Sequence, residues 1–105
     1  MAQAAQPSPV ACNLAAFTPK QRERYNRLLE SLRQATVETR ELPDGYAFRF
    51  ATDESTWMKV AEYVSLERLC CPFFEFKLIH ESEGGAVWLH MTGREVKEFL
   101  SSQLR

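Results

Sequence analysis

The sequence has no long apolar run. No stretch approaches the roughly 18 apolar residues that a membrane-spanning helix needs. The opening residues 1–7, MAQAAQP, contain neither the basic segment nor the apolar segment of a secretory signal peptide. These two absences predict a cytoplasmic protein without a membrane partner.

An excess of charge of either sign is also missing. Thirteen lysines and arginines stand against fourteen acids, which gives a net charge of −1. The basic residues are scattered and accompanied by acids, so the sequence offers no basic stripe that would bind phosphates. We therefore expect no nucleic-acid partner.

Cysteine is scarce, and its number is odd. The chain has three cysteines, Cys12, Cys70 and Cys71, whereas a disulfide framework normally has an even number. Thiols without a disulfide partner persist in a reducing compartment, which again favours the cytoplasm.

The remaining composition is that of an ordinary globular protein. A chain of 105 residues with 45% apolar and 26% charged residues is long enough to bury a core of its own. Residues 1–11 are rich in Ala, Gln and Pro and show no periodicity, so we predict a flexible tail there. Residues 12–105 are expected to form a single α+β domain.

Three segments have helical patterns. Thr18, Pro19 and Gln21 have the spacing of a capping box with proline at the first helical position. A second segment runs up to Pro72, which is expected to end it. Thr92 and Glu95 repeat the capping-box spacing before the last segment. The apolar stripes of the first two segments are Tyr25, Leu28, Leu29, Leu32 and Trp57, Val60, Ala61, Val64.

Between these helices lie two hairpin patterns. Aromatic residues alternate with others after the Pro-Asp-Gly turn at 43–45, and a second alternating run precedes the turn at 82–85. The order helix-hairpin-helix-hairpin-helix predicts a two-layer α+β sandwich with an antiparallel sheet of about four strands. A homodimer is compatible with so small a sheet.

The adjacent cysteines are the strongest candidate for a functional site. They stand at the expected C-terminal end of the second helix, one turn after Glu67 on the same face. The helix dipole and Glu67 both disfavour a thiolate there. A bound metal ion reverses this, because its charge deprotonates the thiols that ligate it. Thiolates select soft ions, so the candidates are Hg(II), Cu(I), As(III) and Cd(II).

Two adjacent cysteines do not have the ligand spacing of a structural zinc site. They suit a soft ion of low coordination number that gains a third thiolate. Cys12 is the only other cysteine and comes just before the first helix. We therefore predict a metal site formed by Cys12, Cys70 and Cys71.

Three stretches, CNLAAFTPKQRERY, ELPDGYAFRF and ERLCCPFFEF, resemble a group of small bacterial proteins of unknown role. These proteins share an N-terminal Cys-Asn-Leu and a Glu-Arg-x-Cys-Cys-Pro-Phe segment, and the resemblance covers most of residues 12–105. It implies that Cys12, Cys70 and Cys71 are shared thiols and that Glu67 and Arg68 belong to the same motif. Some such proteins accompany heavy-metal resistance functions, so the resemblance implies heavy-metal handling but supplies no reaction.

Three functions are open from the residues alone. The first is a soft-metal scavenger, chaperone or sensor. The second is a thiol-dependent enzyme with Cys71 and Glu67 as catalytic candidates and Glu67 as the acid or base. The third is a redox switch formed by Cys70 and Cys71, for which the partner would be a thiol-reactive small molecule. A metal site requires Cys12 near the pair, an enzyme requires a pocket that Glu67 faces, and a switch requires an exposed pair.

Overall fold

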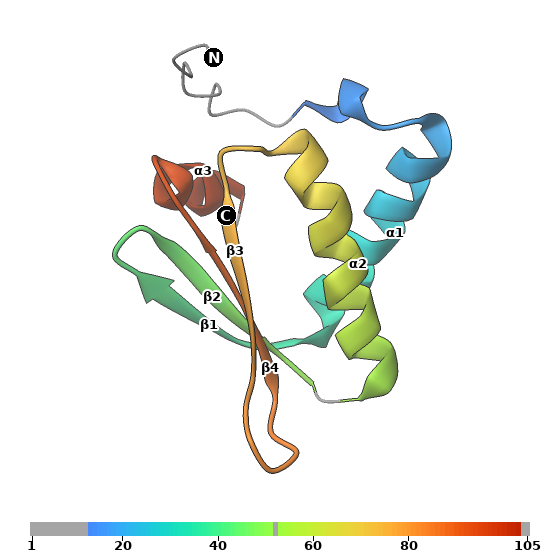
Figure 1. Ribbon diagram of the computed structural model, residues 1–105. Coiled ribbons are helices and arrows are strands. Elements are labelled where there is room, and N and C mark those ends of the chain that lie inside the picture. Colours follow the sequence, from blue (N-terminus) through green and yellow to red (C-terminus); the bar gives the residue numbers. More distant parts are fainter. Residues whose placement is uncertain (1–12, 52, 104–105) are drawn as a thin grey trace, which may run out of the picture.

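The computed structural model describes residues 13–51 and 53–103. In chain order they form a short 3-10 helix η1 (Leu14–Ala16), helix α1 (Pro19–Ala35), strands β1 (Thr36–Leu42) and β2 (Gly45–Phe50), helix α2 (Glu54–Cys70), strands β3 (Glu75–His80) and β4 (Val87–Thr92), and helix α3 (Val96–Gln103) (Figure 1). The tail predicted at residues 1–11 and the metal ligand predicted at Cys12 lie outside the described residues. None of the helices in the described part of the chain is long and apolar enough to cross a membrane.

Both predicted hairpins are present and join into one antiparallel sheet. The strand order is β1-β2-β4-β3, so the second strand of each hairpin lies at the centre of the sheet. Phe48 pairs with Leu89, and Phe50 pairs with Val87. These four side chains share one face of the sheet and pack into the core. The prediction of an α+β fold with a four-stranded antiparallel sheet is therefore confirmed.

The order of elements differs from the predicted one at its N-terminal end, where η1 precedes α1. The Asn13 side chain accepts a hydrogen bond of 3.1 Å from the Ala15 backbone N–H, and the Phe17 N–H donates to the Leu14 carbonyl. A single short turn held in this way has no apolar periodicity by which a sequence could reveal it. The two-layer arrangement stays a prediction.

The predicted cap of the last helix is wrong. Thr92 ends β4, where it pairs with Gly45 on one side and Glu75 on the other, and α3 begins only at Val96. Glu95 has φ of 60°, outside the right-handed helical region. Thr92 therefore pairs within the sheet instead of capping the last helix, as its spacing from Glu95 had predicted.

Side-chain caps fix where α1 and α2 begin. The capping box predicted at Thr18 and Gln21 is present, with both reciprocal hydrogen bonds formed and Pro19 as the first helical residue. At α2 the Asp53 carboxylate accepts from the Thr56 N–H at 2.8 Å. The two helices lie side by side (Figure 1), which brings Tyr25 of α1 next to Tyr63 of α2, with ring centroids 5.8 Å apart.

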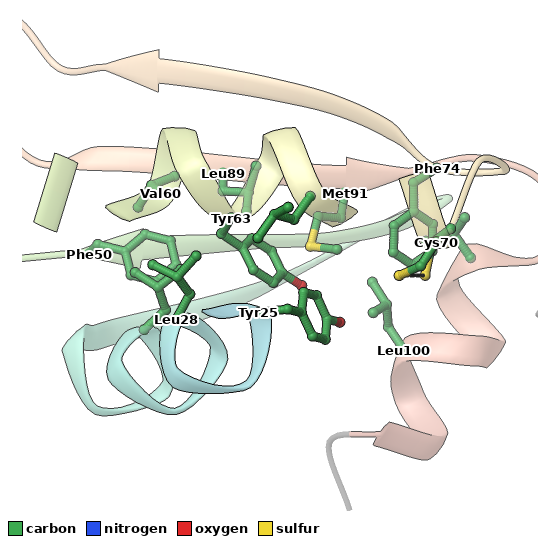
Figure 2. Close-up of a cluster of buried hydrophobic side chains, with 14 of the residues drawn as sticks. Tyr25, Leu28, Phe50, Val60, Tyr63, Cys70, Phe74, Leu89, Met91 and Leu100 are labelled. Atoms are coloured by element: carbon green, nitrogen blue, oxygen red, sulfur yellow. Dashed lines mark hydrogen bonds between the residues drawn. The ribbon is translucent and has the colours of Figure 1, made fainter. Parts of the chain in front are cut away.

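The core lies where both helices, the inner face of the sheet and α3 meet (Figure 2). Its fully buried side chains include aliphatic residues from α1, α2, β4 and α3. Both adjacent cysteines are also fully buried and have no exposed surface. Cys70 lies at the same end of this core as Phe74 and Leu100 (Figure 2). The adjacent cysteines that the sequence analysis marked as a site are therefore part of the packed interior.

Candidate metal centre

The C-terminal end of α2 brings Glu67, Cys70 and Cys71 together. Cys70 is the last helical residue, and Cys71 caps the helix by donating its N–H to the Glu67 carbonyl at 2.8 Å. Pro72 follows, and its ring disfavours helical geometry at Cys71, so the chain turns there. The spacing of three and four residues places the two sulfurs on the side of the helix that carries the Glu67 carboxylate.

The three side chains supply a compact set of metal-ligand atoms. Glu67 Oε1 lies 3.1 Å from Cys70 Sγ and 3.4 Å from Cys71 Sγ, and the two sulfurs are 3.5 Å apart. One carboxylate oxygen and two sulfurs all lie within 4.8 Å of one another, and all three residues are buried. We call these residues the Glu67–Cys70–Cys71 cluster.

Two tyrosines hold the Glu67 carboxylate in place. The Tyr25 hydroxyl donates to Oε1 at 2.9 Å from α1, and the Tyr63 hydroxyl donates to Oε2 from the preceding turn of α2. Burial raises the pKa of both tyrosines above the ordinary value, and the neighbouring Glu67 charge adds to the effect. Both hydroxyls therefore stay protonated and act as donors to the carboxylate.

No cation balances Glu67 within the described residues. Glu67 is only 4% exposed, yet each of the six ion pairs found in residues 13–51 and 53–103 involves another acid. A buried carboxylate is costly unless hydrogen bonds, a counter-charge or a metal compensate it. Hydroxyl and thiol donors satisfy its oxygens, but they do not neutralise its charge.

The cluster is a poor environment for a thiolate without a metal. Burial, followed by the hydrogen bond to Glu67 and its negative charge, raises the pKa of the Cys70 thiol to about 12. Cys70 is a free thiol, whereas Cys71 is disulfide-bonded. Two sulfur ligands are therefore present together only in the reduced protein.

The predicted third ligand, Cys12, lies outside the described residues, but its neighbour Asn13 does not. The Asn13 backbone N–H donates to the Cys70 carbonyl at 2.7 Å. The described chain thus begins in direct contact with the residue that carries one of the two sulfurs. Arg68, which belongs to the same sequence motif, is exposed and is not part of the cluster.

A cavity of about 590 Å³ adjoins the cluster between α1, α2, α3 and the sheet. Glu67, Tyr25 and Tyr63 line it together with Phe74 and a larger set of apolar side chains. Glu67 therefore faces a pocket, as an enzyme or a small-molecule site requires. Because both sulfurs are buried, the exposed dithiol that a simple redox switch requires is not present.

Tyr25 and Tyr63 are the site residues that sequence reasoning missed. The sequence pattern places Tyr25 in the apolar stripe of its helix and gives Tyr63 no role. The available signal was chemical, because a buried tyrosine hydroxyl normally needs a hydrogen-bond partner. Glu67, the acid beside the two cysteines, is a suitable hydrogen-bond acceptor for such a hydroxyl. Tyr25 can donate to it only because α1 packs against α2.

Comparison with known proteins leaves the function to be argued from this geometry. Neither a protein-family model, nor a curated protein, nor a solved structure matches the chain.

Proposed function

We propose that the protein binds a thiophilic metal or metalloid ion through the thiolates of Cys70 and Cys71, in a cytoplasmic role in heavy-metal handling. The ion is the cargo of the protein, drawn from the class of Hg(II), Cu(I), As(III) and Cd(II). The observation that carries the proposal is the buried Glu67–Cys70–Cys71 cluster, whose three ligand atoms lie within 4.8 Å of one another.

Charge is the physical reason for an ion at this place. Two thiolates and the Glu67 carboxylate carry three negative charges, and none of the ion pairs among the described residues involves Glu67. A trivalent centre neutralises the two thiolates and the carboxylate completely. A divalent ion leaves one negative charge, which is the same net charge as that of the metal-free cluster when both thiols are protonated and Glu67 is a carboxylate. The ion also deprotonates Cys70, whose high pKa otherwise keeps its thiol protonated.

Cys12 is proposed as the third thiolate. The proposal is supported by the covalent link between Cys12 and Asn13, because consecutive Cα atoms are about 3.8 Å apart. The Asn13 N–H donates a hydrogen bond to the Cys70 carbonyl, so Asn13, the residue that follows Cys12 in the sequence, lies against the end of α2. Glu67 would then stay beside the ion as a fourth donor or as a neighbouring negative charge.

Native mass spectrometry of the reduced protein tests the proposal. The protein is reduced, desalted and mixed with Cd²⁺ or arsenite in the presence of glutathione as a competing thiol. We expect one ion per chain, with one proton lost for each thiol that becomes a ligand. A reduced protein that takes up neither ion under these conditions would contradict the proposed function.

Three single substitutions identify the ligands. Cys70→Ser is expected to abolish binding, because serine supplies no soft ligand. Cys12→Ser and Glu67→Gln then separate the two candidates for the third ligand. If Cys12 is the ligand, Cys12→Ser weakens binding and one proton fewer is released. If the Glu67 carboxylate is the ligand, Glu67→Gln weakens binding and the number of protons released stays the same. Arg68→Gln serves as the matched control, because Arg68 is an exposed neighbour on the same helix. Binding by Cys70→Ser as tight as that of the unchanged protein would refute the site.

A thiol-dependent enzyme is the second candidate. It is favoured by one observation, the cavity that Glu67 lines. The raised pKa of Cys70 speaks against a thiolate nucleophile at neutral pH. Turnover of a thiol-reactive substrate by metal-free, reduced protein would favour this candidate over metal binding.

A further inference from the structure

The cavity and the metal centre share a wall. Glu67 lines the cavity and contacts both sulfurs. On the other side of the cysteines, Phe74 also lines the cavity, and its N–H donates to the Cys71 carbonyl at 3.2 Å. In sequence, the two cysteines therefore lie between two residues that line the cavity, and Glu67 connects the cavity to the sulfurs, which do not line it themselves.

The size and lining of the cavity are not those of a site for a bare ion. Its volume of about 590 Å³ falls in the range of roughly 300 to 1,000 Å³ that is typical of small-molecule sites. Most of the lining is apolar and includes Leu29 and Leu32 from α1 and Leu89 and Met91 from β4. Its polar residues, besides Glu67 and the two tyrosines, are Asn26, Arg33, Thr36 and Thr39. An apolar group of the size of an aromatic ring suits such a lining.

We infer that the cargo is an organoarsenic(III) compound with an aryl substituent, with the arsenic on Cys70 and Cys71 and the aryl group in the cavity. This inference rests on the proposed function and narrows its ligand. Arsenic(III) forms three single bonds, so two bonds to sulfur leave one for carbon, and in this complex the aryl carbon takes the bond that the Cys12 thiolate would supply to an ion without an organic substituent.

The distance between the sulfurs favours a bent centre. With bonds of about 2.3 Å to sulfur, a linear two-coordinate ion would hold its two sulfurs about 4.6 Å apart. In the structure, where Cys71 is disulfide-bonded, the distance between Cys70 Sγ and Cys71 Sγ is 3.5 Å, which is much shorter. Pyramidal arsenic(III) has S–As–S angles not far above a right angle, and it therefore fits the pair without separating the sulfurs.

The binding reaction starts from the reduced protein, in which a thiol such as glutathione has reduced the disulfide of Cys71 and is itself oxidised to its disulfide. From that state, binding is a ligand exchange without a further redox step. An arylarsonous acid, ArAs(OH)₂, reacts with the two thiols to give ArAs(S-Cys)₂ and two molecules of water. Each thiol proton leaves on a hydroxide of the arsenic, and arsenic stays in the +3 state. Glu67 loses the Cys70 thiol donor but keeps the hydroxyl donors of Tyr25 and Tyr63.

The first test compares two substituents on the unchanged, reduced protein. Dissociation constants are measured for phenylarsine oxide and for methylarsonous acid, each normalised to its affinity for a small free dithiol. Burial of the phenyl ring should make phenylarsine oxide bind about tenfold tighter or more. Equal normalised affinities would overturn the inference, since the cavity would then contribute nothing.

The second test narrows the cavity. Leu29 lines it and stands one turn after Tyr25 on α1, so Leu29→Trp adds an indole ring to the cavity close to the cluster. We expect this variant to weaken phenylarsine oxide about tenfold and to leave arsenite unchanged. Met58→Trp is the matched control, because Met58 is 62% exposed on α2 and does not line the cavity.

The outcomes separate the two proposals. Arsenite binding with no advantage for the phenyl compound would overturn the organoarsenic inference and leave the metal site standing. Failure of the reduced protein to bind either arsenite or phenylarsine oxide would overturn the proposed function itself. Circular dichroism of both tryptophan variants establishes that they are folded, and the two-substituent test requires no variant.

Discussion

At the scale of single residues, Glu67 connects the helices, the sulfurs and the cavity. Its carboxylate accepts hydrogen bonds from Tyr25 and Tyr63 and from the thiol of Cys70. A carboxylate with three donors in the interior is stabilised only as long as those donors stay in place. Loss of one hydroxyl should therefore be costly in the metal-free protein.

We predict that Tyr63→Phe lowers the free energy of unfolding of the metal-free protein by about 2 kcal/mol, because a buried charged acceptor loses a donor. Urea denaturation of the reduced protein measures the change. Tyr46→Phe is the control: Tyr46 lies on β2, its hydroxyl is not part of the cluster, and the expected change is within about 0.5 kcal/mol. Equal losses in both variants would show that the hydroxyl of Tyr63 does not stabilise Glu67.

The same residues show how far sequence reasoning reaches. Helical spacing predicted that Glu67 lies beside Cys71, and the observed Oε1–Sγ distance of 3.4 Å agrees, because both residues belong to one helix end. The contact from Tyr25 crosses 42 positions of the chain and depends on how α1 packs on α2. Local periodicity identifies the buried face of a helix, but it does not say which polar group the neighbouring helix brings to that face.

At the scale of secondary-structure elements, Glu81 organises the hairpin between β3 and β4. Its carboxylate accepts hydrogen bonds from the Trp88 indole N–H at 2.7 Å and from the Ala86 backbone N–H at 2.9 Å, and it pairs with Arg49 of β2. These contacts, with the Trp88 hydrogen bond first, lower the pKa of Glu81 from 4.5 to about 2. The folded state therefore favours the ionised carboxylate.

We predict that Glu81→Gln makes the protein less stable at pH 7 and that the difference from the unchanged protein shrinks in acid. Because the folded pKa is depressed, the contribution of Glu81 is complete above the unfolded pKa near 4.5 and is lost as the pH falls towards about 2. Urea midpoints measured from pH 7 to pH 2 follow this loss. Glu83→Gln in the same turn is the control, and a pH-independent difference for Glu81→Gln would contradict the assignment.

Gly45 is the second element-scale feature, since β2 begins there in close contact with β4. A Cβ atom at Gly45 would lie 2.0 Å from the Met91 carbonyl oxygen and 2.8 Å from the Thr92 Cα. Both neighbours are backbone atoms, so the strands would have to separate. The Pro-Asp-Gly turn was predicted from sequence, but this need for glycine comes from the pairing of two strands of different hairpins.

We predict that Gly45→Ala lowers the free energy of unfolding by about 3 kcal/mol, as expected when an atom is forced into a packed contact. Gly84→Asn is the matched control. Gly84 has a positive φ of 75°, which asparagine tolerates, and a Cβ atom at this position would meet no described atom within 4 Å. Chemical denaturation of both variants decides the matter: a Gly45→Ala protein as stable as the control would show that the strands adjust freely.

At the scale of the whole molecule, the cluster and the cavity join elements that are distant in sequence. The hydroxyl of Tyr25 comes from α1, the ligand atoms come from the last turn of α2 and its C-cap residue Cys71, and residues of the sheet and Leu100 of α3 line the cavity. The four-stranded sheet was predictable, because alternation and turn chemistry are local signals. The cavity was not predictable from the sequence, because its volume is the space that remains after the helices and the sheet have packed together.

A ligand at this junction should stabilise the entire domain. Binding that occurs only in the folded state adds about 2.7 kcal/mol at a free ligand concentration of a hundred times the dissociation constant. For a domain of about 100 residues, that corresponds to a rise in melting temperature of about 10 °C or more. We therefore expect arsenite at this concentration to raise the melting temperature of the reduced protein by that amount, as measured by differential scanning calorimetry. Cys70→Ser is the control, because its hydroxyl can still donate to Glu67 while the soft ligand is gone. An equal rise in this variant would place arsenite elsewhere on the molecule, and no rise in the unchanged protein would mean that the ion does not favour the folded state.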